Sequence, residues 1–211
     1  MNICTATDSY KMAHYGMYPE GTKRVYSYFE SRGGAVFPET VFFGLQSILK
    51  ELAGNVVTRE NIEFGRYMTA KHLGSEEVFN AARWEYILEK YDGRLPVRIK
   101  AVPEGTAIPT GNVLMTVENL DDKCFWLTNH LETWLTHVWY PSTVASLSRG
   151  VKKTLTESLE KTGSSTDMLD FMLHDFGMRG VSSMESAEMG GLAHLTQFKG
   201  TDTIVALERG M

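Results

Sequence analysis

One segment near the C-terminal end of the chain, Leu173–Glu185, constrains the fold more than any other. The apolar run Met168–Leu173, interrupted only by Asp170, leads into it and has the length and composition of a buried strand. Ser182 and Glu185 then have the S-x-x-E spacing of a capping box, which starts a helix by pairing otherwise unbonded backbone N–H groups. The segment therefore predicts a strand, a short loop and a helix.

The loop between this predicted strand and helix contains side chains of distinct chemistry. Phe176 supplies an aromatic ring, Arg179 a fixed cation, and Gly177 and Gly180 permit tight turns or close ligand approach. A guanidinium beside a helix N-terminus attracts phosphate, because free N–H groups, the helix dipole and a bidentate fork all favour an anion. An ordinary β-to-α turn without a ligand has the same composition, so both interpretations stay open.

A second polar cluster follows one helix later, at Phe198–Thr203. Gly200 breaks the preceding helix, and Thr201–Ala206 is predicted as a short strand. Asp202 would then lie at the carboxyl edge of parallel strands, on the same rim as Arg179, where parallel α/β folds place their active sites. The alternative interpretation is that Asp202 only caps a helix.

The N-terminal segment is rich in aromatic residues. Asp8 fits the N-cap of a short helix that ends at Gly16, and Tyr10 fits a packing residue on that helix. Val25–Glu30 alternates as a strand does. Arg32, beside two glycines, is a further candidate for a phosphate site.

The middle of the chain alternates between helical and strand patterns. Apolar spacing predicts helices at Thr40–Leu52, from Thr58 to about His72 before Gly74, at Glu76–Tyr91, from Asp121 to about Val138 where Pro141 ends it, and after Ser142. Leu95–Val117, with alternating residues and Pro-Gly turns, predicts a small antiparallel sheet. Lys161–Thr166 is the most linker-like stretch, so we expect an N-terminal α+β domain over residues 1–165 and an α/β unit over 166–211.

Composition limits the class of protein. A net charge of −5 and a pI near 5.7 argue against a general nucleic-acid binder. Cys4 and Cys124 suggest neither a disulfide framework nor a metal motif, which fits a reducing cytoplasm. The sequence has no secretion signal and no apolar run of membrane-spanning length. We therefore expect a soluble, cytoplasmic protein.

Residues 167–211 are too short for a domain of their own. Two strand–helix units neither close a barrel nor bury both faces of a parallel sheet. We therefore expect either that the chain is a fragment or that it completes its fold with another chain.

Several motifs spread along the chain resemble nicotinamide phosphoribosyltransferases. They are Asp8–Lys11, Tyr26–Glu30, Thr40–Gln46, Tyr86–Gly93, Ile99–Gly105, Leu173–Gly177, Arg179–Ser183 and Phe198–Thr203. The resemblance runs almost end to end, yet it covers only the N-terminal part of those enzymes, somewhat under half. The later segments, including the histidine that ATP phosphorylates and much of the phosphoribosyl pyrophosphate (PRPP) site, lie beyond it. The loop after Arg32 is shorter than in animal members, and Met178 replaces their tyrosine.

The resemblance implies a fold and a reaction. The fold is α/β: an α+β N-terminal domain packed on an irregular α/β barrel, of which residues 166–211 supply the first strand–helix units. In the reaction, the ring nitrogen of nicotinamide displaces pyrophosphate from PRPP and gives nicotinamide mononucleotide, a step of NAD salvage.

The resemblance also implies roles for individual residues. Phe176 would stack on one face of the pyridine ring and Tyr10 of a second subunit on the other, while Asp202 would accept a hydrogen bond from the carboxamide. Arg179 would contact the ribose phosphate. Asp8 would support the shared site, and Arg32 would reach a PRPP phosphate.

The implied partners follow from the same resemblance. Mg²⁺ would accompany PRPP and pyrophosphate, and ATP would act through the part of the family beyond this chain. The protein would be a homodimer with shared sites or would pair with a complementary C-terminal chain.

Two other functions remain to be weighed. The chain could be a non-catalytic remnant or regulatory subunit, or it could belong to the related nicotinate enzymes and use an acid substrate. The carboxylate of Asp202 favours the amide over the acid.

Overall fold

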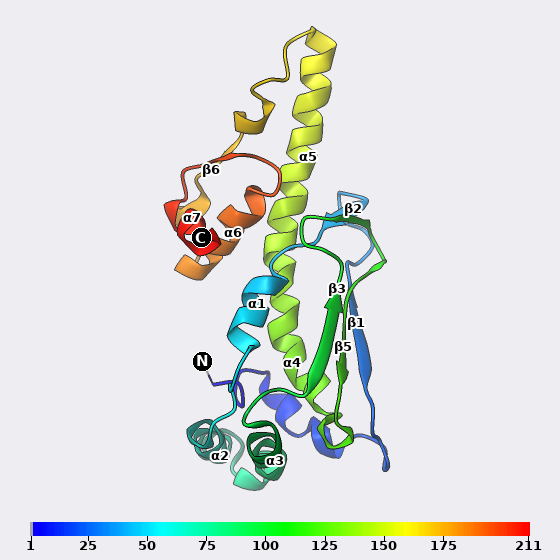
Figure 1. Ribbon diagram of the computed structural model, residues 1–211, viewed down its shortest axis with the longest axis vertical. Helices are drawn as coiled ribbons and strands as arrows, with labels where there is room; N and C mark the ends of the chain where they lie inside the picture. Colours follow the sequence, from blue (N-terminus) through cyan, green and yellow to red (C-terminus); the bar gives the residue numbers. More distant parts are fainter. Residues whose placement is uncertain (1) are drawn as a thin grey trace. The chain divides into compact units, whose positions relative to one another are not determined.

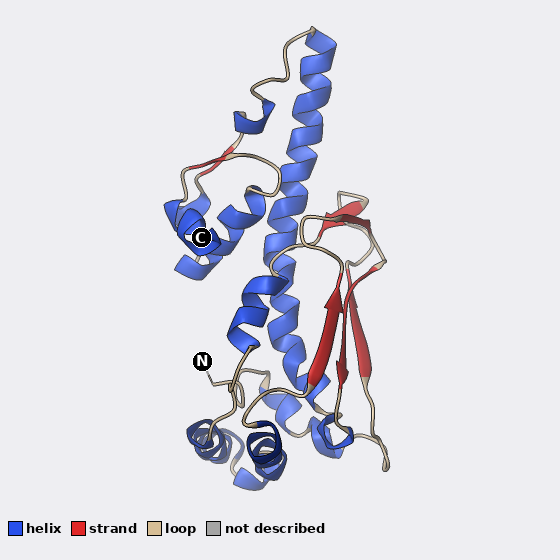
Figure 2. Ribbon diagram, in the orientation of Figure 1, coloured by secondary structure: helices blue, strands red, loops and turns tan. Residues whose placement is uncertain are grey.

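The computed structural model describes residues 2–211 and has a mixed α/β architecture (Figures 1 and 2). The predicted α/β class is therefore confirmed. Contacts divide the chain into two compact units. The first comprises the chain up to Phe29, Gln46–Ala101 and Met115–Thr136, and the second comprises Glu30–Leu45, Val102–Leu114 and His137–Met211.

The first unit combines an antiparallel sheet with helices. The three strands have the order β1-β5-β3, and β3 and β5 pair so that Val97 lies opposite Asn119. The elements are the 3-10 turns η1 (Ser9–Met12), η2 (His14–Gly16), η3 (Glu76–Val78) and η4 (Asp122–Cys124), the strands β1 (Tyr26–Glu30), β3 (Val97–Ala101) and β5 (Val113–Asn119), and the helices α1 (Leu45–Leu52), α2 (Arg59–Leu73), α3 (Ala81–Tyr91) and α4 (Leu127–Leu135). The strands β1 and β5 and the helix α1 each extend by one or two residues into the second unit.

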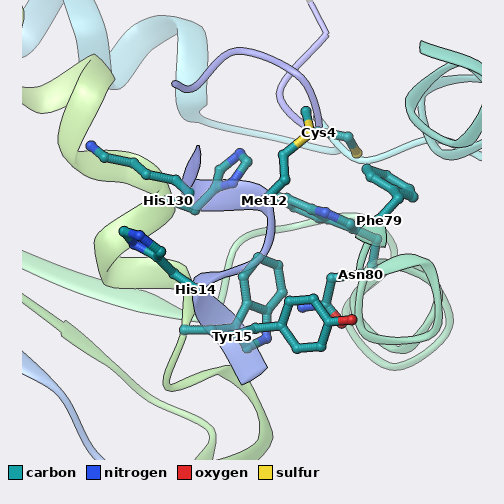
Figure 3. A pocket seen from close by; sticks show the side chains of 10 residues that line it. Cys4, Met12, His14, Tyr15, Phe79, Asn80 and His130 are labelled. Atoms are coloured by element: carbon teal, nitrogen blue, oxygen red, sulfur yellow. The ribbon is translucent and has the colours of Figure 1, made fainter. Parts of the chain in front are cut away.

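The core of the first unit is built on rings that meet edge to face. Trp84 contacts Trp126 and His130, with ring centroids 4.7 and 4.9 Å apart. Aromatic pairs prefer this geometry, because the positive edge of one ring meets the negative face of the other. A small cavity beside them is lined by Cys4, and burial raises the pKa of that thiol to about 12 (Figure 3).

The second unit is organised along one long helix, α5 (Trp139–Thr162). Its serines pair with backbone groups near the strand β2: Ser146 accepts from the N–H of Val41 at 2.9 Å, and Ser142 accepts from the N–H of Phe43 at 3.1 Å. The other elements are β2 (Glu39–Val41), β4 (Ala107–Pro109), β6 (His174–Asp175), β7 (Gly200–Thr201), the 3-10 turns η5 (Thr136–Val138, whose first residue belongs to the first unit), η6 (Leu169–Phe171) and η7 (Gly177–Gly180), and the helices α6 (Met184–His194) and α7 (Ile204–Gly210). The helix α6 packs against both α5 and α7 (Figure 1).

The structure confirms the predictions that rest on strong local signals in the sequence. The helix α2 is capped at its start by Thr58, whose side chain accepts from the N–H of Asn61, and ends at Gly74 in the left-handed conformation. The predicted antiparallel sheet is present as β3 and β5, and the predicted strand at the N-terminal side is present as β1.

The helix predicted at Thr40–Leu52 begins later than expected. Glu39–Val41 instead forms β2 and pairs with β4, and the helix begins only at Leu45. Pro141 does not end a helix but lies in the first turn of α5, where a missing N–H costs no helical hydrogen bond. The helix predicted at 76–91 is broken into a 3-10 turn and a shorter α-helix, and the one predicted at 121–138 is broken into a shorter α-helix with a 3-10 turn on each side.

The two strands predicted near the C-terminal end are also wrong in extent. Within the predicted strand Met168–Leu173, residues Leu169–Phe171 form the turn η6, and only His174–Asp175 forms a strand, β6. The run contains no β-branched residue, and β-branched residues favour strands. Asp170 is held by Lys152 and Lys199 at 2.6 and 2.8 Å, which fixes the turn against α5. After β7, the chain becomes helical at Ile204 instead of extending to Ala206.

The first two residues of the predicted linker at 161–166 still belong to α5, which ends at Thr162 and is capped by Gly163. Both sides of it fall in the second compact unit, so the division into domains at residues 1–165 and 166–211 stays a prediction. No helix within residues 2–211 has the length and apolar character needed to cross a membrane.

Gly93 is the position where backbone geometry most restricts the residue type. Its φ is +76°, and a Cβ there would lie 2.3 Å from the carbonyl oxygen of Val57. We expect Gly93→Ala to lower the free energy of unfolding by about 3 kcal/mol or more, because left-handed strain adds to displacement of the backbone. Gly74→Ala is the control, since its φ is +79° with nothing within 4 Å, and should cost only about 1 kcal/mol. If urea unfolding showed the same loss of unfolding free energy in Gly93→Ala and Gly74→Ala, the clash with Val57 would be contradicted.

His130 makes the stability of the first unit depend on pH. Burial lowers its pKa to about 4, and its Nε2 lies 2.7 Å from the carbonyl oxygen of Ile3, which it can reach only as a donor. The neutral ring is thus favoured in the folded state, whereas the unfolded chain takes up a proton near pH 6.5. The neutral His130 ring contributes on the order of 3 kcal/mol to the free energy of unfolding. This contribution is fully present above pH 6.5 and is lost as the pH falls toward 4.

The measurement is the urea midpoint, followed by tryptophan fluorescence, at several pH values between 7 and 4. His130→Gln keeps a donor for Ile3 but does not titrate, so its stability should vary less over this range. Equal pH dependence of the two proteins would assign the effect to other groups.

Candidate functional site

The candidate site lies at the carboxyl ends of the two parallel strands. In the register of β6 and β7, His174 lies opposite Gly200 and Asp175 opposite Thr201. The loop after β6 contains Phe176 and Arg179, and Asp202 directly follows β7. An open pocket of about 590 Å³ is lined by these three side chains and by the start of α6. The structure thus brings together the three residues that the two motifs had pointed to.

The chemistry of this pocket is mixed. Phe176 is 70% exposed, so its ring is available to a ligand. Arg179 is exposed within η7. The helix α6 begins beside them at Ser183, whose side chain accepts from the N–H of Ser186 at 3.1 Å. The N-cap is therefore Ser183 and not the predicted Ser182, and the residue three positions later is Ser186 and not Glu185. A ring, a guanidinium and a helix N-terminus on one pocket suit a flat molecule joined to an anionic group.

Asp175 joins the two loops of the site. One of its carboxylate oxygens accepts from the N–H of Gly177 at 3.1 Å, and the other accepts from the hydroxyl of Thr203 at 2.5 Å. Its backbone carbonyl accepts from the N–H of Asp202 at 2.7 Å. The residue next to Phe176 thus fixes the position of both loops.

His194 joins the starts of the same two strands. Its Nε2 lies 3.1 Å from the carbonyl oxygens of Leu173 and Gly200, so this nitrogen donates. Its Nδ1 then accepts from the hydroxyl of Ser148 on α5 at 3.0 Å. The ring is buried and stacks on Phe198 with centroids 5.1 Å apart. This histidine holds the short parallel ladder in place.

Sequence reasoning assigned no role to Asp175 or His194. Asp175 immediately precedes Phe176 at the predicted strand end, which would have been a usable signal. His194 lies on an apolar helix, and only its partners, distant in sequence, identify its role. His174 also went unassigned, and its Nδ1 lies 3.8 Å from a carboxylate oxygen of Asp202.

Asp8 and Tyr10 belong to the first unit. Asp8 accepts from the hydroxyl of Thr133 at 2.9 Å, and this hydrogen bond, with the charge of Lys11, outweighs desolvation and lowers the pKa of the carboxyl group. The ammonium of Lys11 is buried and pairs with Glu132 at 2.8 Å. Tyr10 is 61% exposed, and its ring contacts that of His14, with the centroids 5.3 Å apart. Asp8 does not cap η1 with its side chain, contrary to expectation.

Arg32 belongs to the second unit and lies in the exposed segment between β1 and β2. Within residues 2–211 it forms no ion pair. Arg32 is not among the residues that line the pocket of Phe176, Arg179 and Asp202.

The described residues contain no cluster of three or more His, Cys, Asp or Glu side chains able to hold a metal ion. Mg²⁺ commonly keeps several waters and binds through substrate phosphates and one or two carboxylates.

Removal of the Asp175 carboxylate should loosen the site without unfolding the unit. In Asp175→Ala we expect amide hydrogen exchange at Gly177 to accelerate about tenfold or more, because a charge-assisted hydrogen bond is lost. Asp175→Asn should stay near wild type, since the amide oxygen still accepts from Gly177 and the amide nitrogen can donate to Thr203. The exposed Asp167→Ala is the control, and equal exchange in all four proteins would show that Asp175 does not hold the loop.

Two family models match separate parts of the chain. The model described as nicotinamide phosphoribosyltransferase, N-terminal domain, matches residues 2–99. The model of the nicotinate phosphoribosyltransferase family matches residues 171–210, which include both loops of the site pocket.

Curated relatives extend the similarity over nearly the whole chain. A nicotinamide phosphoribosyltransferase of Xanthomonas campestris is 50% identical over 98% of this chain and 43% of its own length. Those of Acinetobacter baylyi and Mycoplasma genitalium are 33% and 30% identical, over 99% and 95% of this chain and 44% and 49% of their own. The chain thus spans less than half the length of these relatives.

A solved structure shows the same fold. The crystal structure of human nicotinic acid phosphoribosyltransferase aligns with 95% of this chain and 36% of its own, with a TM-score of 0.61 and 18% identity. At that identity the likeness concerns the fold alone. From the sequence matches, the resemblance inferred from the motifs is confirmed: this chain corresponds to the N-terminal part of the nicotinamide phosphoribosyltransferases.

Proposed function

We propose that this chain provides the nicotinamide-binding part of an enzyme that transfers phosphoribosyl from PRPP to nicotinamide. The products would be nicotinamide mononucleotide and pyrophosphate. The observation that supports this most directly is the convergence of Phe176, Arg179 and Asp202 on one pocket. The similarity to nicotinamide phosphoribosyltransferases over 98% of the chain supports the same activity.

Nicotinamide would bind between an aromatic ring and a carboxylate. Phe176, with its exposed ring, would stack on one face of the pyridine. Asp202, whose side chain is 65% exposed, would accept a hydrogen bond from the carboxamide NH₂. Tyr10 of a second subunit would cover the other face. Stacking fixes the plane of the ring, and the hydrogen bond fixes its rotation within that plane.

The phosphoribosyl group would bind at the basic side of the pocket. Arg179 and the N-terminus of α6, which line the pocket, would contact the ribose phosphate. Arg32 would reach a PRPP phosphate. When bound with PRPP, Mg²⁺ would neutralise the pyrophosphate leaving group. Displacement at the anomeric carbon depends on positioning and on charge stabilisation, so the residues of this chain would hold the ring nitrogen in line with that carbon.

The remaining parts of the proposal concern assembly. The working protein would be a homodimer with shared sites, which Asp8 would support, or would pair with a complementary C-terminal chain. ATP would stimulate the reaction through segments that the longer relatives have beyond this region. The reaction would take place in the cytoplasm.

A second candidate function is that of a non-catalytic regulatory subunit, which would bind nicotinamide without turnover. Use of nicotinate is the other possibility, and Asp202 argues against it. Two carboxylates about 4 Å apart repel by about 4 kcal/mol at an effective dielectric near 20. Half of that value, about 2 kcal/mol, already gives a roughly thirtyfold preference for the amide.

Asp202→Asn tests how the substrate is recognised. The change removes a charge and adds a donor, so it should weaken nicotinamide binding and relieve the repulsion of nicotinate together. We expect the dissociation constant for nicotinate divided by that for nicotinamide, both measured by titration calorimetry, to be lower than in the wild type by about tenfold or more. In protein that turns over PRPP, the ratio of kcat/KM values should shift in the same direction.

Glu208→Gln is the matched control, because it removes an exposed carboxylate of α7 that does not line the pocket. It should leave the ratio unchanged. An unchanged ratio in Asp202→Asn would mean that Asp202 does not contact the carboxamide, and absence of nicotinamide binding by the wild type would contradict the proposed function.

A further inference from the structure

The first unit contains an open pocket, distinct from the candidate site, in which positively charged side chains outnumber negatively charged ones. It has a volume of about 510 Å³ and lies between the loop before β1, the helix α3 and the segment from η4 to α4. Lys23, Arg83 and Lys123 line it together with one carboxylate, that of Asp122. In a chain whose net charge is −5, such a grouping is a local exception.

These three cations differ from the basic residues around them in having no counterion. Within residues 2–211, none of them forms an ion pair. Their neighbours do, since Lys90 lies 2.7 Å from Asp121 and Arg24 lies 3.3 Å from Glu118. The surrounding charge is thus neutralised, while the charge that faces the pocket is not.

Arg83 is held in place without using its hydrogen-bond donors. Its guanidinium carbon lies 5.0 Å from the ring centroid of Phe125 and 5.4 Å from that of Tyr15, and the side chain is half-buried. Cation–π contacts of this kind fix a guanidinium while leaving its N–H groups free. Within residues 2–211, no hydrogen bond from these N–H groups is formed, although a guanidinium has five donors to satisfy. An oriented guanidinium with free donors is suited to an oxyanion.

The aromatic rings of the pocket are already occupied by cations. Lys123 and Lys90 lie over the ring of Tyr86, at 4.8 and 5.2 Å from its centroid, and Arg83 lies over Phe125. These contacts compete with stacking of a ligand base on the same rings. We therefore propose that the pocket lined by Lys23, Arg83 and Lys123 binds a compact polyanion of the phosphate or diphosphate class. The site uses residues of the first unit alone and goes beyond the nicotinamide contacts proposed above.

The test uses inorganic pyrophosphate with the whole chain, by titration calorimetry and by amide chemical shifts. Arg83→Gln and Lys123→Gln should each weaken binding about tenfold, because each removes a charge-assisted contact. Binding by the wild type should also weaken as NaCl rises from 50 to 200 mM. Shifts should centre on Thr22, Lys23 and Lys123.

Two further variants make the outcome decisive. Lys71→Gln is the matched control, because Lys71 lies 5.7 Å from the ring centroid of Tyr67 but does not line the pocket, and binding should be unchanged. Arg179→Gln tests whether pyrophosphate binds instead in the pocket of the second unit, which Arg179 lines. Lys123 is exposed, so its loss should not affect folding even if that of Arg83 does. No binding, equal affinity in Lys123→Gln and wild type, or binding lost only in Arg179→Gln would each overturn the proposal.

Discussion

The pairing of β6 with β7 is the constraint on which the candidate site depends. A parallel ladder of two residues on each strand has little stability of its own. His194 ties the starts of both strands to α6 and α5, and Asp175 ties together the loops that leave them. The candidate side chains at the rim, Phe176, Arg179 and Asp202, are exposed, whereas Asp175 and His194, which hold the strands and loops behind them, are hydrogen-bonded.

The first unit relies on a comparable use of buried polar groups. Asn119 is fully buried and donates to the carbonyls of Lys23 and Asp121, while its oxygen accepts from the N–H of Val25. Burial raises the pKa of Asp121, but hydrogen bonds from Lys90 and Tyr91 more than offset this and hold the pKa well below its usual range. Satisfied in this way, buried polar groups specify one arrangement of the strands, because any other would leave them unpaired.

Glycines in the second unit show how closely the helices behind the site approach. A Cβ on Gly191 would lie 2.5 Å from Cβ of Ala206, and one on Gly190 would lie 2.8 Å from the hydroxyl of Tyr140. The contact of α6 with α7 and with α5 therefore requires small residues. This close packing supports the strands from which the loops of the site extend.

The sequence by itself determined the elements whose signals are local and the residues of the site motifs. Thr58 and Gly74 bound a helix through contacts within a few residues, and Phe176, Arg179 and Asp202 were recognisable from their motifs. Only the tertiary structure decided the pairing of β2 with β4, the turn at Asp170, and the roles of Asp175 and His194. Each of these depends on partners far away in the chain, and a window of sequence contains no record of the group that will satisfy a distant donor or acceptor.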